Sequence, residues 1–101
     1  MEIAKNIKII DNLQCQLLSL VSQLFLSMQN SDMTTAERAE ILANIEVILY
    51  LLSEKLGVPC KTLDQKAIAR IKIGILKEES NEEWKNSLLG ILHYLDNRTK
   101  K

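Results

Sequence analysis

Few side chains in this 101-residue sequence have the types and spacing that catalysis requires. The single histidine, His93, lies opposite the apolar face of its predicted helix, and no motif places Cys15 or Cys60 beside it. A thiolate nucleophile needs a neighbouring base, so the sequence indicates no catalytic pair. The isolated glycines also form no phosphate-binding loop. We therefore predict a protein that is not an enzyme and that carries no cofactor.

Acidic side chains gather around one predicted turn, where carboxylates could bind a divalent cation. They are Glu78, Glu79, Glu82 and Glu83. Their spacing is not that of a calcium loop, and carboxylates at the start of a helix favour its dipole. The sequence also lacks a Cys-x-x-Cys pair and a histidine cluster. We predict no metal site.

Basic side chains form the most informative charged pattern. The thirteen bases balance thirteen acids, so the net charge is zero. Nevertheless, Lys66, Arg70 and Lys77 share one face of a predicted helix, with Ile73 among them. This face is either simply solvated or a docking surface for an acidic protein or lipid headgroups. A neutral chain without aromatic residues between its bases does not fit nucleic acid, so we expect no nucleic-acid partner.

The first predicted helix carries a heptad pattern of apolar residues. The pattern runs through Ile3, Ile7, Ile10, Leu17, Val21, Leu24 and Met28. Gln14 interrupts it. Gln14 is either a core residue hydrogen-bonded within the chain or a residue that sets the register of a homodimer. We therefore expect a monomer or a homodimer.

Capping patterns divide the remaining chain. Three pairs have the spacing of a capping box: Thr34 with Glu37, Thr62 with Gln65, and Ser80 with Glu83. Gly57 and Pro59 end the second helix, since glycine adopts a left-handed conformation and proline cannot continue a helix.

The pattern predicts an all-α fold, an antiparallel four-helix bundle with a single domain over residues 1–101. The predicted helices cover about 3–29, 35–56, 63–79 and 81–97. Alternation across Ile71, Ile73 and Ile75 also fits a strand, but no second strand exists to pair with it. Trp84 is expected to anchor the core, with a partly exposed contact residue as the alternative.

One segment is long enough to cross a membrane. Residues 12–31 carry no charge, but they contain four glutamines, which are costly in lipid. We expect a buried helix of a cytoplasmic protein without a transmembrane span. The start of the sequence lacks the features of a signal peptide. In a reducing cytoplasm Cys15 and Cys60 are expected to be free thiols, with a disulfide as the alternative.

The stretch from Leu17 to Leu52, LLSLVSQLFLSMQNSDMTTAERAEILANIEVILYLL, resembles the class II bacteriocin immunity proteins of the enterocin A immunity group. It combines an aliphatic first helix, an Asn-Ser-Asp break and a second helix that starts with Thr and Glu. The resemblance implies a cytosolic antiparallel four-helix bundle that engages a bacteriocin-receptor transporter complex at the membrane. The candidate contacts are then Lys66, Arg70, Ile73, Lys77, Arg98 and Lys100.

A different class of function remains open on the residues alone. The long first helix would suit a small adaptor or chaperone-like protein that dimerises or binds a partner helix. This reading predicts a dimer, whereas a strictly monomeric protein would contradict it.

Overall fold

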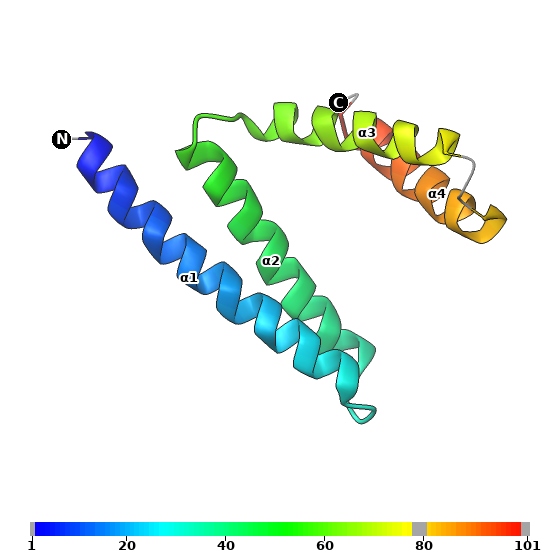
Figure 1. Ribbon diagram of the computed structural model, residues 1–101, viewed down its shortest axis with the longest axis horizontal. Coiled ribbons are helices and arrows are strands. Elements are labelled where there is room, and N and C mark those ends of the chain that lie inside the picture. Colours follow the sequence, from blue (N-terminus) through cyan, green and yellow to red (C-terminus); the bar gives the residue numbers. More distant parts are fainter. Residues whose placement is uncertain (1, 78–80, 100–101) are drawn as a thin grey trace. The chain divides into compact units, whose positions relative to one another are not determined.

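The structure, a computed structural model, describes residues 2–77 and 81–99 and contains four α-helices in that part of the chain. They are α1 (Glu2–Gln29), α2 (Thr35–Lys55), α3 (Cys60–Leu76) and α4 (Glu82–Thr99), shown in Figure 1. Helix α1 packs against α2, and α3 packs against α4. These two antiparallel hairpins belong to two units, Met1–Val58 and Pro59–Lys101. The predicted all-α class with four helices is confirmed, and the single-domain organisation stays a prediction.

The connection between α1 and α2 is a short polar turn that is fixed by local hydrogen bonds. The Asn30 side chain accepts from the Asp32 backbone N–H at 3.0 Å. At the start of α2, the Thr34 hydroxyl accepts from the Glu37 backbone N–H at 3.1 Å, and the Glu37 carboxylate accepts from the Thr34 backbone N–H at 3.0 Å. The predicted capping box is confirmed.

The end of α2 also follows the sequence pattern. The helix ends at Lys55, one residue before the predicted end, and Leu56 is its C-cap. Gly57 has a φ of 86°, the left-handed conformation that glycine adopts without strain. Behind it, the Ser53 hydroxyl donates to the Val58 carbonyl at 2.7 Å, and the Val58 backbone N–H donates to the Ser53 carbonyl at 2.8 Å. These bonds close the turn that leads out of the first hairpin.

Helix α3 begins earlier than predicted. It starts at Cys60 with Pro59 as N-cap, so the predicted capping box of Thr62 with Gln65 is wrong. Proline has a fixed φ and no N–H, which suits the edge of a helix, and the Pro59 carbonyl accepts the Leu63 backbone N–H at 3.0 Å. Residues 71–75 are helical, so the alternative of a strand is excluded there.

Both ends of the α3–α4 connection differ from the prediction. Helix α3 ends at Leu76, and Lys77 is extended with a ψ of 133°. The predicted cap Ser80 and the predicted helix end at residue 79 lie outside the described residues. The Asn81 side chain instead caps α4 and accepts from the Trp84 backbone N–H at 2.7 Å. Helix α4 extends to Thr99, two residues beyond the predicted end.

Small residues are among the most buried ones in both hairpins. Ser27 and Ser53 are buried in the first hairpin and Gly74 in the second. Among the described residues, the buried apolar side chains are Leu13 and Ile48, each 7% exposed. Many larger apolar side chains are exposed on the hairpin surfaces.

Helix α1 differs from the expected buried helix. Its segment Asn6–Gln29 is long and apolar enough to cross a membrane by length and composition alone, as are core helices of soluble proteins and signal sequences. Little of this segment is buried. Gln14, which interrupts the heptad pattern, is exposed, so the first hairpin does not enclose it. The predicted absence of a transmembrane span stays a prediction.

Candidate functional site

A cleft of about 590 Å³ lies within the second hairpin, between α3 and α4. It is lined by Arg70, Ile71, Gly74, Lys77, Asn81, Trp84 and Leu88. Trp84 is 58% exposed, so the expectation that it anchors the core is wrong. The alternative of a partly exposed contact residue fits its position in the wall of the cleft.

The helix pair determines how these side chains meet. Arg70 lies within α3, and Lys77 directly follows the last residue of this helix. The two residues are seven positions apart, about two helical turns, so both lie on the same side of the helix axis. Between them, a Cβ added to Gly74 would lie 3.2 Å from Cδ1 of Leu88. The absence of a side chain at Gly74 therefore lets α4 approach α3 closely. At the other wall, the Asn81 cap fixes the first turn of α4, from which Trp84 projects.

The lining of this cleft combines charge with a flat apolar surface. A guanidinium and an ammonium group, from Arg70 and Lys77, can donate several charge-assisted hydrogen bonds to phosphate oxygens. The Trp84 indole offers a face on which a planar ring can stack. Ile71 and Leu88 supply apolar walls that exclude water around such a ring. This combination suits an anionic ligand with an aromatic part.

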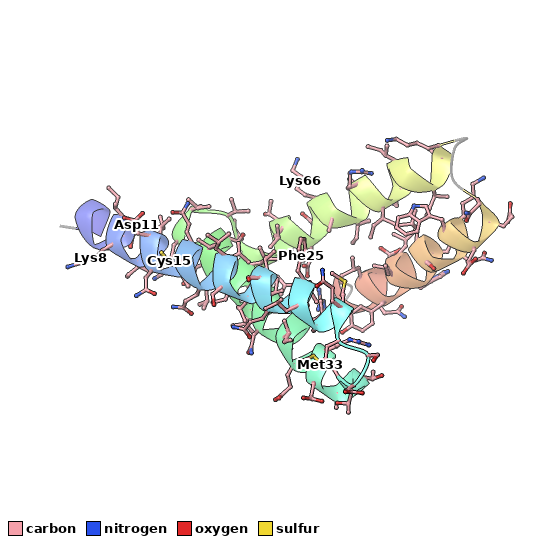
Figure 2. All side chains as sticks on the ribbon, turned by 60° about the horizontal axis from the view of Figure 1, so that its bottom comes forward. Lys8, Asp11, Cys15, Phe25, Met33 and Lys66 are labelled. Atoms are coloured by element: carbon pink, nitrogen blue, oxygen red, sulfur yellow. The ribbon has the colours of Figure 1, made fainter. Side chains whose placement is uncertain are left out.

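The other candidate partner-binding residues lie outside this cleft. Lys66 and Ile73 are exposed on α3, and the Lys66 side chain projects away from the helix (Figure 2). Arg98 is engaged within the second hairpin, since its Nη2 lies 3.1 Å from Oδ2 of Asp64 and its guanidinium lies 5.3 Å from the centroid of the Tyr94 ring. Lys100 lies outside the described residues. The structure thus brings together Arg70 and Lys77 from the predicted set.

Sequence reasoning missed Trp84 and Asn81 as lining residues. Lys77 precedes the connection between α3 and α4, whereas Asn81 and Trp84 follow it. In addition, the sequence analysis assigned the N-cap of the fourth helix to Ser80 instead of Asn81. An asparagine three residues before Trp84 is an equally good cap.

A second, smaller cleft of about 330 Å³ lies within the first hairpin. It is lined by Gln16, Ser19, Leu20, Gln23, Asn44, Val47 and Ile48. The Gln16 amide donates to Oδ1 of Asn12 at 2.8 Å, and the Gln23 amide donates to the Ser19 hydroxyl at 3.4 Å. The polar part of this lining is therefore neutral, with amide and hydroxyl groups from both helices.

The described residues offer no cluster of three His, Cys, Asp or Glu side chains that could hold a metal ion. Cys15 and Cys60 are exposed free thiols, and His93 is exposed. In the acidic group at the α3–α4 connection, Glu82 and Glu83 are exposed in the first turn of α4. Glu78 and Glu79 lie outside the described residues.

The fold and the clefts define a small all-α protein that carries a cationic and aromatic cleft between two of its helices. The profile of the MazG-like family matches residues 3–88, which is most of the chain, and the chain therefore belongs to the MazG-like family. This is an all-helical, nucleotide pyrophosphohydrolase-like family. No curated protein and no solved structure shows a significant match.

The family assignment corrects two expectations from the sequence. The resemblance to bacteriocin immunity proteins is wrong, because the matched profile belongs to a different helical family and spans both hairpins. The resemblance rested on an amphipathic pattern that unrelated helical bundles share. The expectation that the protein is not an enzyme also loses its support, because the family is related to nucleotide pyrophosphatases.

Proposed function

We propose that this protein binds a nucleoside phosphate in the cleft between α3 and α4. The observation that carries the proposal is that Arg70, Lys77 and Trp84 line the same cleft. The two cations would bind the phosphates, and the indole would stack on the base. Membership of a nucleotide pyrophosphohydrolase-like family supports this ligand class over the acidic protein surface or lipid headgroups that the basic face alone allowed.

The size and openness of the cleft agree with such a ligand. A volume of about 590 Å³ lies within the range of small-molecule sites. Trp84 is exposed enough for one face of its ring to receive a base. A phosphate chain is flexible, so it can reach both cations from a base stacked on the indole.

The proposal is tested by titrating the protein with ATP and CTP while following fluorescence of Trp84, the single tryptophan. We expect a change in emission that saturates. Arg70→Gln and Lys77→Gln should each weaken binding by roughly tenfold or more, because a hydrogen bond to a charged group contributes about 1.5–3 kcal/mol. Lys66→Gln is the matched control, since Lys66 is also a base on α3 but lies outside the cleft lining.

Adenosine provides the control for the ligand, because it keeps the base but lacks the phosphates. It should bind far more weakly than ATP. An unchanged affinity in both cleft variants, or equal losses in the Lys66 control, would contradict the proposed site.

A second candidate function is self-association through α1. It corresponds to the adaptor or chaperone-like protein that the sequence analysis left open. Leu18 and Phe25 on α1 are 73% and 60% exposed, and Figure 2 labels Phe25 on this helix. The uncharged middle of α1 offers no like charges that would keep two copies apart. The occupant of this face would be a second copy of the chain.

Light scattering at several protein concentrations tests this candidate. A dimer is expected, and Leu18→Lys with Phe25→Lys should convert it to a monomer, because two charged side chains cannot be desolvated without partners. Ile91→Lys on α4 is the control, since Ile91 is 49% exposed and belongs to the other hairpin. A monomeric parent protein at all concentrations would exclude the candidate.

A further inference from the structure

A third hollow, an apolar groove of about 530 Å³, lies along α2. Its described lining residues all belong to this helix and are Ala39, Leu42, Ala43, Ile45, Glu46 and Leu49. Leu42 and Leu49 are large, apolar and exposed. The two alanines are small, so large side chains from a partner helix can fit beside them and between the leucines. The groove therefore has the shape of a surface against which another helix packs.

Acidic side chains accompany this groove. Glu46 lines it, and Glu40 lies about one helical turn before Ala43 of its wall. Both glutamates are exposed. Helix α2 carries four acidic and two basic residues, and one of these bases, Arg38, donates to the carbonyls of the α1–α2 turn. The groove is thus complementary to apolar side chains that are accompanied by bases.

The outer face of α3 has this second combination. Ala69, Ile73 and Leu76 are spaced by four and three residues, so they form a stripe on one side of the helix. Ile73 is exposed, and Leu76 is 82% exposed. Lys66 and Lys72 are also exposed, and the helical rotation places one on each side of this stripe. Apolar knobs between positive charges therefore remain available on the second hairpin.

The two faces complement each other in shape and in charge. The side chains of Ile73 and Leu76 suit the groove between the leucines of α2, and the lysines beside them attract its glutamates. Helix α3 carries four basic residues and one acidic residue, the opposite excess to that of α2. Since both faces belong to one chain, two copies can make this contact twice, and the pair then closes around a twofold axis.

We propose that the α2 groove is occupied by a second copy of this chain, which inserts Ile73 and Leu76 of its α3, and that the reciprocal contact closes a dimer. The electrostatic part of the contact joins Glu40 and Glu46 of one copy to the lysines of the other. This interface is separate from the exposed face of α1, and it does not depend on nucleotide binding.

The experiment uses two charge-reversed forms of the full chain, one with Glu40→Lys and Glu46→Lys and the other with Lys66→Glu and Lys72→Glu. The parent should have the mass of two chains by light scattering. Each form alone should dimerise about tenfold more weakly or worse, because both contacts of the pair become repulsive. An equal mixture of the two forms should recover the dimer, because every contact then joins lysines to glutamates.

Lys8→Glu is the control for the charge change, since Lys8 is exposed on α1, and it should leave the dimer intact. Leu76→Lys is a second variant that keeps the test decisive if a charge-reversed form folds poorly by circular dichroism. Because Leu76 is 82% exposed, its replacement should leave the helix content unchanged and still weaken the dimer. Raising the salt from about 0.05 M to about 0.5 M should weaken the parent dimer roughly threefold or more, because exposed charges are screened.

Several outcomes would overturn the inference. They are a parent that is monomeric at all concentrations, charge-reversed forms that dimerise as tightly as the parent, and a mixture that does not recover the dimer. A dimer that is lost in Leu18→Lys with Phe25→Lys but kept in both charge-reversed forms would also overturn it and support the α1 candidate. Titration with ATP, followed by Trp84 fluorescence, tests the proposed nucleotide site separately, so either proposal can fail while the other holds.

Discussion

Gly57 and Gly90 differ in backbone conformation, so replacing each by alanine should have opposite effects on stability. Gly57 has a φ of 86°, whereas Gly90 lies within α4 and a Cβ added there would meet nothing within 4 Å. Gly57→Ala should destabilise the protein by about 1–2 kcal/mol, because side chains are strained in the left-handed region. Gly90→Ala should stabilise it by roughly 0.5–1 kcal/mol, because alanine favours a helix. Urea unfolding followed by circular dichroism measures both, and effects of the same sign would contradict this interpretation.

Glu37 should make stability depend on pH. Its pKa lies below the usual value of 4.5, because the backbone N–H and the hydroxyl of Thr34 both donate to the carboxylate. Since the folded pKa is lower than the unfolded one, ionised Glu37 stabilises the fold fully above the unfolded value. That contribution is lost as the pH falls through the folded pKa.

The variant Glu37→Gln isolates this effect, because glutamine keeps an acceptor oxygen but does not titrate. The parent protein should be the more stable of the two at neutral pH, and the difference should shrink as the pH falls below 4.5 and through the lowered pKa of folded Glu37. Urea unfolding at several pH values provides the measurement. A difference that is constant over this range would show that the carboxylate charge does not contribute.

Local spacing was enough to predict some of these residue roles. The capping box of Thr34 with Glu37 and the turn at Gly57 follow from contacts between residues close in sequence, which the sequence displays directly. The same spacing failed at Thr62, because Pro59 starts the helix three residues earlier and leaves Thr62 inside it.

At the scale of helices, Arg38 joins the end of α1 to the start of α2. Its Nη2 donates to the carbonyls of Ser27 and Asn30, both at 3.0 Å. These carbonyls belong to the end of α1 and the following turn, where partners within the helix are missing. Arg38→Met should destabilise the first hairpin by about 1–2 kcal/mol, because both charge-assisted bonds are lost at a partly exposed position.

The matched control for Arg38→Met is Arg38→Lys, which keeps the charge but replaces the planar guanidinium with a single ammonium. Its loss should be intermediate. Unfolding by urea measures all three proteins. Equal stability of the parent and the methionine variant would show that the two bonds are fully replaced by water.

The positions of the helices were predictable, and the cleft between α3 and α4 was not. Amphipathic periodicity depends on each helix alone, so it gave the four helices to within a few residues at their ends. The cleft depends on how α3 and α4 pack. Trp84 looked like a core residue on its own helix, but its side chain is exposed in the wall of the cleft. The sequence showed Arg70 and Lys77 as part of a basic face. It did not show that Trp84 lines the same cleft, and the combination of two cations with an indole is what indicates the class of ligand.

At the scale of the whole chain, the amphipathic pattern and the family profile assigned the protein to different families. Four amphipathic helices with short connections are common to many unrelated proteins, so this pattern could support the fold class and not the family. The family match spans residues 3–88 and therefore uses positions in both hairpins. Function then depends on a few lining side chains, which an amphipathic pattern does not determine.

Each hairpin leaves several large apolar side chains exposed, which leads to a prediction for the isolated parts. In the first hairpin the buried apolar side chains are Leu13 and Ile48, while Leu18, Phe25 and Leu26 are each at least 60% exposed. A two-helix unit of this size buries too little apolar surface to offset the entropy of ordering its helices. The fragment of residues 1–58 should therefore show much less helix per residue by circular dichroism than the intact chain.

Residues 59–101 should behave in the same way, and both fragments should unfold in urea over a broader range than the intact chain, because the slope of unfolding scales with the surface that becomes exposed. Mixing the two fragments should restore helix if each supplies apolar surface that the other lacks. A fragment that is fully helical at micromolar concentration and unfolds cooperatively would contradict this interpretation. If such a fragment is also dimeric by light scattering, a second copy covers its apolar face, as the self-association candidate requires.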